Sequence, residues 1–364
     1  MRYGLIILAF SVALAGESQG RATAGDGPLP PGAPNGPIKC GWGAGPHVHE
    51  QLAKTTAWVS RPERQVTYLS TDGTFAVHYD TTALGPNGMD HSPDLTDSDT
   101  SGTPDWVEEV AVALTEVRDL LLELRFDPAP DDGDGIYDVY LAGNLRRLYD
   151  NIRGETYGLT NPETHLGGDR WTSYIELDND FSVDESFFTN GLDGARVTVA
   201  HEYFHAVQMG YVFRYPIGFF QDKYLYELAS TWFEDVAFPE INDWAPWFLA
   251  GTGAFGRSPV QPLADTDGYS IAIFGHYLTE KYGLGLMTDL WIRFPSASNA
   301  LVALRDELTS QNTNLTAAWT DFVAGLFFNG TDSEYLFYPD QVLLGQPMIA
   351  PPQVLADSVR LTFA

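Results

Sequence analysis

The sequence predicts an α+β protein in which a mixed sheet region near the N-terminus precedes a mostly helical C-terminal lobe. Three segments of the first half have the pattern of strands, at 75–79, 136–141 and 174–177. One helix is expected among them, at 106–124. Helical spacing of apolar residues dominates afterwards, at about 195–213, 223–237, 268–282, 284–293, 298–309 and 315–328. Strands first and helices later favour a site between two lobes.

The ends of the chain differ in composition from its middle. Residues 1–15 carry a basic residue, a short apolar run and a small-x-small triplet, which is typical of a cleaved secretory signal. The run is too short for a bilayer helix, which needs about 20 apolar residues. Residues 16–46 are rich in Gly and Pro and predict a flexible segment or pro-segment. We therefore expect a secreted protein with its main domain at 47–330 and a partly β extension at 331–364.

The composition excludes some classes of partner. The net charge of −29, from 49 acidic and 20 basic side chains, argues against nucleic acid, because phosphate backbones require stripes of Lys and Arg. It suits a soluble exported protein, or carboxylates gathered for hard cations. No segment after the signal is long enough to span a membrane. Cys40 is the only cysteine, so no internal disulfide can form.

A short histidine motif lies in the helix predicted at 195–213. His201 and His205 are four residues apart, so a helix places both imidazoles on one face, one turn apart, as two ligands of one tetrahedral ion require. Glu202 lies beside them, where a carboxylate can accept a proton from water at the metal. This five-residue pattern is short enough to arise by chance, so a further ligand is needed to support it.

The next predicted helix supplies a third ligand. Glu227 follows His205 after 21 residues, which leaves room for a turn and a returning helix. Two His and one Glu, with the fourth position open to water, form a known catalytic zinc set. Glu234, on the same helical face, is the alternative ligand, or it orients a histidine as an outer partner. A solvated surface carboxylate is the other interpretation of Glu227.

These motifs together resemble a known family. His-Glu-x-x-His followed by Glu-x-x-x-Thr-Trp-x-Glu-Asp is similar to secreted bacterial metalloproteases of the myxobacterial type and, more broadly, to gluzincin peptidases. The similarity covers roughly residues 38–295 and includes three upstream segments, 75–80, 102–108 and 137–140.

The resemblance implies a zincin-like fold with Glu202 as the general base. The ligands that it implies are those already singled out: His201, His205 and Glu227. Gluzincins commonly place a Tyr or His across from the zinc to stabilise the oxyanion. Tyr269, which opens a predicted helix, is the first candidate for this role and His276 the second. Ordinary packing is the other interpretation of Tyr269.

Residues 97–108 fit the 12-residue calcium loop. Its candidate ligands are Asp97, Asp99, Ser101, Thr103, Asp105 and Glu108. Gly102 allows the sharp turn of such a loop. Ser101 lowers the ligand charge, which predicts a modest affinity suited to extracellular Ca²⁺. A capped turn ahead of the helix at 106–124 is the alternative.

We expect a zinc-dependent metallopeptidase that hydrolyses protein or peptide substrates. Two alternatives remain open: a secreted calcium-binding protein with a structural metal site, or a zinc hydrolase of a non-peptide ester or amide. A closed structural site needs a fourth protein ligand, and Glu234 is the residue to examine. The thiol of Cys40, followed by Gly41, is a candidate for the open zinc position, where it would hold the enzyme latent. An incidental buried cysteine is the other interpretation.

Overall fold

The computed structural model describes residues 38–40, 61–82, 92–143, 145, 156–183, 187–214, 217–249, 263–326, 338, 340, 343, 353–355 and 358–360. The predicted signal, most of the Gly/Pro-rich segment and residues 47–60 lie outside this part of the chain. Among the described residues, no helix has both the length and the apolar character that crossing a membrane requires.

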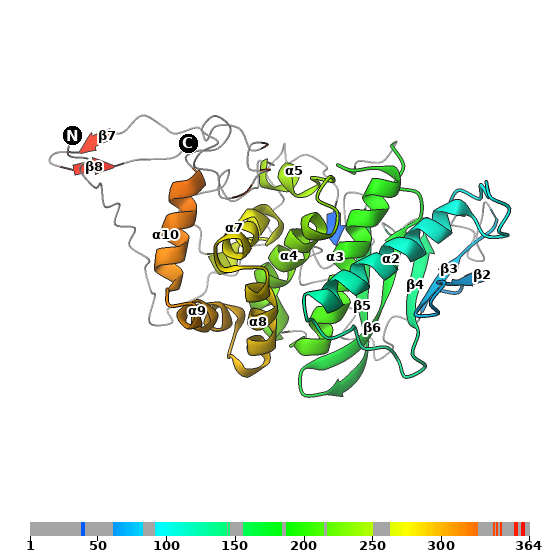
Figure 1. The fold of residues 1–364 in the computed structure, drawn as a ribbon, viewed down its shortest axis with the longest axis horizontal. Coiled ribbons are helices and arrows are strands. Elements are labelled where there is room, and N and C mark those ends of the chain that lie inside the picture. Colours follow the sequence, from blue (N-terminus) through cyan, green and yellow to red (C-terminus); the bar gives the residue numbers. More distant parts are fainter. Residues whose placement is uncertain are drawn as a thin grey trace.

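A six-stranded mixed sheet forms one side of the molecule, and with the helices it confirms the α+β class (Figure 1). Its spatial order is β1-β5-β6-β4-β3-β2. The strands are β1 (Ile38–Cys40), β2 (Val66–Leu69), β3 (Phe75–Tyr79), β4 (Tyr137–Ala142), β5 (Thr156–Gly167) and β6 (Arg170–Asp178). Strands β3, β4 and β6 run parallel, whereas β5 and β2 are antiparallel to their neighbours β6 and β3. The edge strand β1 is parallel to β5.

Within the described part of the chain, two helices lie against this sheet. α2 (Asp105–Glu123) contacts β3, and α3 (Gly191–Tyr211) contacts β5 and β6. α3 also packs against α2 and α4 (Ile217–Ala237), so every residue from Gly194 to Met209 except Arg196 is buried. Polar side chains in the middle of α3 therefore point into protein rather than into solvent.

The helical lobe follows on the far side of α3 (Figure 1). It contains α4, α5 (Trp244–Leu249), α7 (Ala272–Tyr282), α8 (Gly285–Arg293), α9 (Ala300–Ser310) and α10 (Leu315–Leu326). A short 3₁₀ turn, η4 (Tyr269–Ile271), leads into α7. The helices expected in the second half are all present, and α4 begins six residues earlier than the pattern indicated. Near the C-terminus, β7 (Gln353–Leu355) and β8 (Ser358–Arg360) form an antiparallel pair apart from the main sheet.

Three strands of the sheet were not predicted: β1, β2 and β5. β5 lacks a clean apolar alternation because buried polar residues such as Thr160 and Asn161 interrupt it. β1 lies inside the segment expected to be flexible, yet Lys39 and Cys40 are buried. This difference arises because β1 owes its order to contacts with β5 and the helical lobe rather than to its own short sequence.

The core of the helical lobe gives a stability test with a matched control. Trp291 is completely buried and makes edge contacts with Phe204, Tyr226 and Phe294, whereas its neighbour Ile292 is 56% exposed. We expect Trp291→Ala to lower the free energy of unfolding by about 3–5 kcal/mol. Ile292→Ala should change it by less than about 0.5 kcal/mol. Urea unfolding of the metal-free proteins measures both, and equal losses would contradict the assigned packing.

Candidate metal centre

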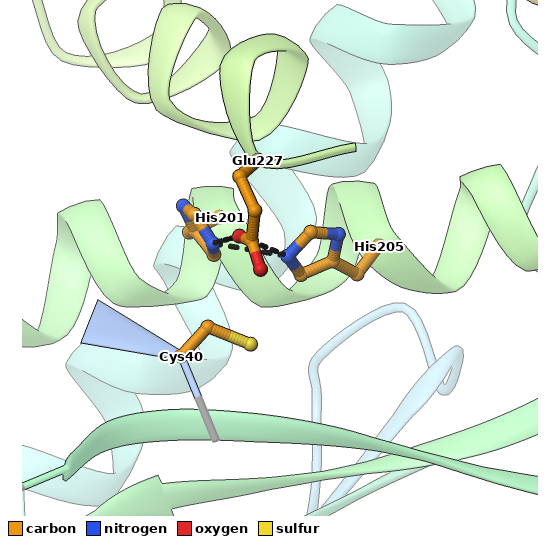
Figure 2. A group of neighbouring side chains, drawn as sticks. All are labelled: Cys40, His201, His205 and Glu227. Carbon is orange, nitrogen blue, oxygen red and sulfur yellow. Dashed lines mark hydrogen bonds and ion pairs between the residues drawn. The ribbon is translucent and has the colours of Figure 1, made fainter. Parts of the chain in front are cut away.

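Three buried ligand atoms converge between α3 and α4. The Nε2 atoms of His201 and His205 lie 3.0 Å apart, and Glu227 Oε2 lies 3.2 Å from each of them. Figure 2 shows Glu227 descending from α4 onto the two imidazoles, which project from one face of α3. All three side chains are at most 1% exposed.

The electrostatics of this group favour a bound cation. Ligands about 2.0 Å from a tetrahedral zinc stand roughly 3.3 Å apart, close to the separations observed here. Burial opposes ionisation of Glu227, but the positive charge that His205 can carry and the hydrogen bonds from both imidazoles outweigh it and lower the pKa of this carboxyl. Burial likewise opposes the charged form of His201, yet Glu227 and Glu234 raise its pKa to about 9. Glu227 Oε1 makes no hydrogen bond among the described residues. The donor set therefore fits a divalent metal ion.

The other nitrogen of each imidazole is held by a separate partner. His201 Nδ1 donates to Glu234 Oε1 at 2.6 Å, and His205 Nδ1 donates to Gln208 Oε1 at 2.8 Å. Ser230 Oγ lies 3.1 Å from the same His205 nitrogen. Such partners fix the tautomer that presents Nε2 to the metal. Glu234 thus contacts the outer nitrogen of His201, whereas Glu227 faces the ligand nitrogens.

Two of these outer partners were missed from the sequence. Gln208 lies three residues after His205 on α3, so the i, i+3 relation was the signal that could have identified it. Ser230 is one turn beyond Glu227 on α4 and carried no comparable signal, because serine is common on helix surfaces.

Glu202 lies on the sheet side of α3, against β5. A Cβ at Gly158 would come within 2.7 Å of Glu202 Cγ, so glycine is needed at this position of β5. Thr160 Oγ1 lies 2.7 Å from Glu202 Oε2 and steadies the carboxylate. The other oxygen, Oε1, makes no hydrogen bond among the described residues, and burial raises the pKa of Glu202. A buried carboxylate with an unused oxygen is available for proton transfer.

Strand β1 brings Cys40 close to the three ligand atoms. Its Sγ and the ligand atoms of His201, His205 and Glu227 all lie within 4.8 Å of one another. In Figure 2 Cys40 approaches from the side opposite Glu227. The thiol also contacts Glu202 Oε2 at 3.7 Å. Among the described residues, the candidate centre therefore contains four potential ligands: the three predicted ones and Cys40, which the sequence had suggested for the open position.

Lys39, the residue before Cys40, was not identified from the sequence. Its buried ammonium forms ion pairs with Asp243 and, at 2.7 Å, with Glu234 Oε2. The rings of Tyr157 and Trp247 lie 5.4 and 5.5 Å from the same nitrogen. Burial disfavours the charged form, but the two carboxylates outweigh it and raise the pKa of Lys39. Lys39 therefore stays a cation that connects β1 to the partner of His201.

Of the two oxyanion candidates, the structure brings only Tyr269 close to the centre. Its ring lies 5.9 Å from that of His201, and burial together with the nearby Glu227 carboxylate raises the pKa of its hydroxyl well above the usual value. Gly268 permits this approach, because its φ is +92° and a Cβ there would come within 2.5 Å of Glu227 Cβ. His276 instead stacks on Tyr338, with ring centroids 4.1 Å apart, and lies 3.8 Å from Asp235. It does not contact the ligand group.

The calcium-type loop begins before α2 and includes its first turn, which carries Asp105 and Glu108. Carboxylate oxygens of Asp97, Asp99 and Asp105 lie within 4.8 Å of one another. Gly102 has φ +93°, the left-handed conformation that the sharp turn requires. Ser101 Oγ donates to Glu108 Oε1 at 2.8 Å, and a contact of 3.3 Å links Ser101 Oγ to the carbonyl of Thr103. The six predicted residues thus belong to one compact loop.

A scan against protein-family models finds no match to this chain, and a search of curated proteins finds none either. The residues and geometry of the centre are therefore what bears on its function.

Ligands and outer partners should differ in their effect on metal affinity. Glu234→Ala should weaken zinc binding by about 10- to 100-fold, the usual effect of losing an outer partner, and Glu227→Ala should weaken it further. The exposed Glu240 on the same polypeptide gives the control, since Glu240→Ala should leave affinity unchanged. Competition with a chromogenic chelator measures all three. A larger loss for Glu234→Ala than for Glu227→Ala would exchange the two roles.

Proposed function

We propose that this chain is an exported zinc-dependent metallopeptidase with a zincin-like catalytic domain. The observation that carries the proposal is a buried carboxylate, Glu202, next to three convergent ligand atoms from His201, His205 and Glu227. A site that only stores or stabilises a metal has no need for such a carboxylate.

Each residue of the centre has a chemical task in this proposal. Zinc, when bound by the two imidazoles and Glu227, supplies Lewis-acid chemistry that polarises a carbonyl and makes water more acidic. Glu202 accepts the proton of the attacking water and passes it to the leaving amine. Thr160 donates to Glu202 Oε2, the oxygen that also contacts the Cys40 thiol, and so fixes the orientation of the carboxylate. The hydroxyl of Tyr269 donates to the developing oxyanion.

The extended strand that lies beside the centre favours a peptide substrate. β1 is an extended polypeptide segment paired with β5, and its register places Cys40 opposite Gly158. The edge of β5 next to Glu202 can therefore bind an extended backbone through main-chain hydrogen bonds. This observation favours peptides over a compact non-peptide ester or amide.

One observation favours a second function, a closed structural metal site. A structural zinc site has four protein ligands, and Cys40, rather than the expected Glu234, is placed to be the fourth. In that case Glu202 would be dispensable both for metal binding and for any activity, which makes this residue the discriminating one.

The loop at 97–108 is proposed to bind Ca²⁺ and to stabilise the start of α2. The clustered oxygens of Asp97, Asp99 and Asp105 and the turn at Gly102 support this assignment. Its role is structural, because the loop contributes no side chain to the metal centre.

Glu202→Gln tests the catalytic proposal directly. The variant should retain zinc, because every ligand remains, and should lose peptide hydrolysis by at least about 100-fold, because proton transfer is removed. Zinc content and cleavage of casein or a peptide library are measured together. Both are compared in wild-type and Cys40→Ser backgrounds, so that the thiol cannot mask turnover. Unchanged turnover in a zinc-loaded Glu202→Gln protein would overturn the mechanism.

Calcium removal tests the loop. Chelation of Ca²⁺ with zinc kept in supply should lower the melting temperature, because an ion bound only by the folded state stabilises it by about 2.7 kcal/mol at a concentration 100 times its Kd. An Asp97→Ala, Asp99→Ala double variant should melt at the same temperature with and without chelation. An equal shift in the two proteins would remove this loop from the proposal.

A further inference from the structure

The position of Cys40 coincides with the position that the proposed reaction requires for water. A water molecule activated by Glu202 must contact both that carboxylate and the metal. Cys40 Sγ is 3.7 Å from Glu202 Oε2 and no more than 4.8 Å from the ligand atoms of His201, His205 and Glu227. The sulfur and the water therefore compete for one place.

The chemistry and geometry of this sulfur suit a metal ligand. A sulfur and a nitrogen bound to one tetrahedral zinc stand about 3.5 Å apart, so an adjustment of roughly 1 Å brings Sγ into range. Glu227 Oε2 lies 3.2 Å from both imidazole Nε2 atoms, and buried Glu202 Oε1 has no hydrogen bond among the described residues. A cation between these buried groups compensates their negative charge, which water or a packed side chain does not.

Lys39 holds the thiol in position. Its ammonium is buried between Glu234 and Asp243, and Asp243 also accepts hydrogen bonds from Thr189 and Trp247. Removing this cation leaves two buried carboxylates without their counter-ion, which is strongly unfavourable. β1 is therefore fixed at two successive residues, one by ion pairs and one at the metal centre.

The backbone of β1 occupies the edge of the sheet as well. β1 pairs with β5 at Thr156 and Gly158, beside the side chain of Glu202. A peptide substrate that added to β5 here would need the same hydrogen-bonding groups. One short strand thus covers the ligand position and the proposed peptide-binding edge together.

We propose that β1 is a built-in inhibitory strand, in which the Cys40 thiolate is the fourth metal ligand and Lys39 is its anchor. This inference rests on the proposed function, because it concerns the state in which that catalytic centre is closed. The thiol releases one proton as it binds the ion, and Glu202 Oε2 or solvent accepts it; no oxidant or reductant takes part. The centre opens when β1 leaves, and water takes the place of sulfur.

Cobalt spectroscopy of the full chain tests the ligand. Cobalt(II) replaces zinc in tetrahedral sites, and a bound thiolate gives a near-ultraviolet sulfur-to-cobalt charge-transfer band. We expect this band in wild type and its absence in Cys40→Ser and Cys40→Ala, which still bind the metal. Their zinc affinity should fall by at least about 100-fold, since losing a ligand exceeds the loss of an outer partner. Cobalt bound to wild type without the band would overturn the inference.

Activity measurements test latency separately. Zinc-loaded wild type, shown by mass spectrometry to be uncut, should hydrolyse peptides at least about 10-fold more slowly than Cys40→Ser at the same zinc occupancy. Lys39→Met, which keeps the thiol and removes the anchor, should also raise the rate and weaken the cobalt band. Equal rates for wild type and all variants would overturn latency while leaving the peptidase intact. A sulfur-to-cobalt band with no hydrolysis by any variant would instead reject the proposed function and establish a structural site.

Discussion

The candidate metal centre depends on one constraint: two imidazole rings are fully buried, so each of their four nitrogens needs a partner inside the protein. Two nitrogens face Glu227, and the other two face Glu234 and Gln208. The helix α4 must therefore pack along α3 in a register that presents Glu227 and Glu234 to different sides of His201. The packing of α4 against α3 therefore determines the geometry of the centre.

Close backbone approach is the second requirement of this arrangement. β5 can lie beside Glu202 only because position 158 has no side chain, and η4 can reach Glu227 only because Gly268 adopts a positive φ. Both contacts bring a polar hydroxyl near the centre, from Thr160 on one side and Tyr269 on the other. Small residues thus set which functional groups reach the ligand atoms.

Local sequence patterns predicted several elements of this structure. The i, i+4 histidines, the apolar stripe of α2 and the strands β3 and β4 are features of neighbouring residues, and the structure has them where the sequence indicated. The roles of Glu227 and Glu234 could not be separated in this way, because they lie seven residues apart on one face of the helix. Only the position of His201 between them distinguishes a ligand-side carboxylate from an outer one.

The sequence suggested Cys40 as a ligand, but it indicated neither the strand β1 that carries this residue nor the buried Lys39 beside it. Lys39 would be expected in solvent, and it is buried only because Asp243, 204 residues away, and Glu234 compensate its charge. Cys40 likewise meets Glu202 across 162 residues. Because β1 lies in a segment rich in Gly and Pro, no periodicity of apolar residues indicates a strand there. Its contacts with β5 and the helical lobe therefore could not be predicted from the sequence.

The chain of contacts from Asp243 through Lys39 and Glu234 to His201 has a thermodynamic consequence. Because Glu234 serves both β1 and a ligand imidazole, the seating of the strand and the affinity for the cation are linked quantities. Linkage is reciprocal: if a seated β1 strengthens metal binding by some factor, bound metal strengthens the seating of β1 by the same factor. Under the proposed function, the cation and β1 are effectors of each other, and a change in metal supply would change how readily the strand leaves.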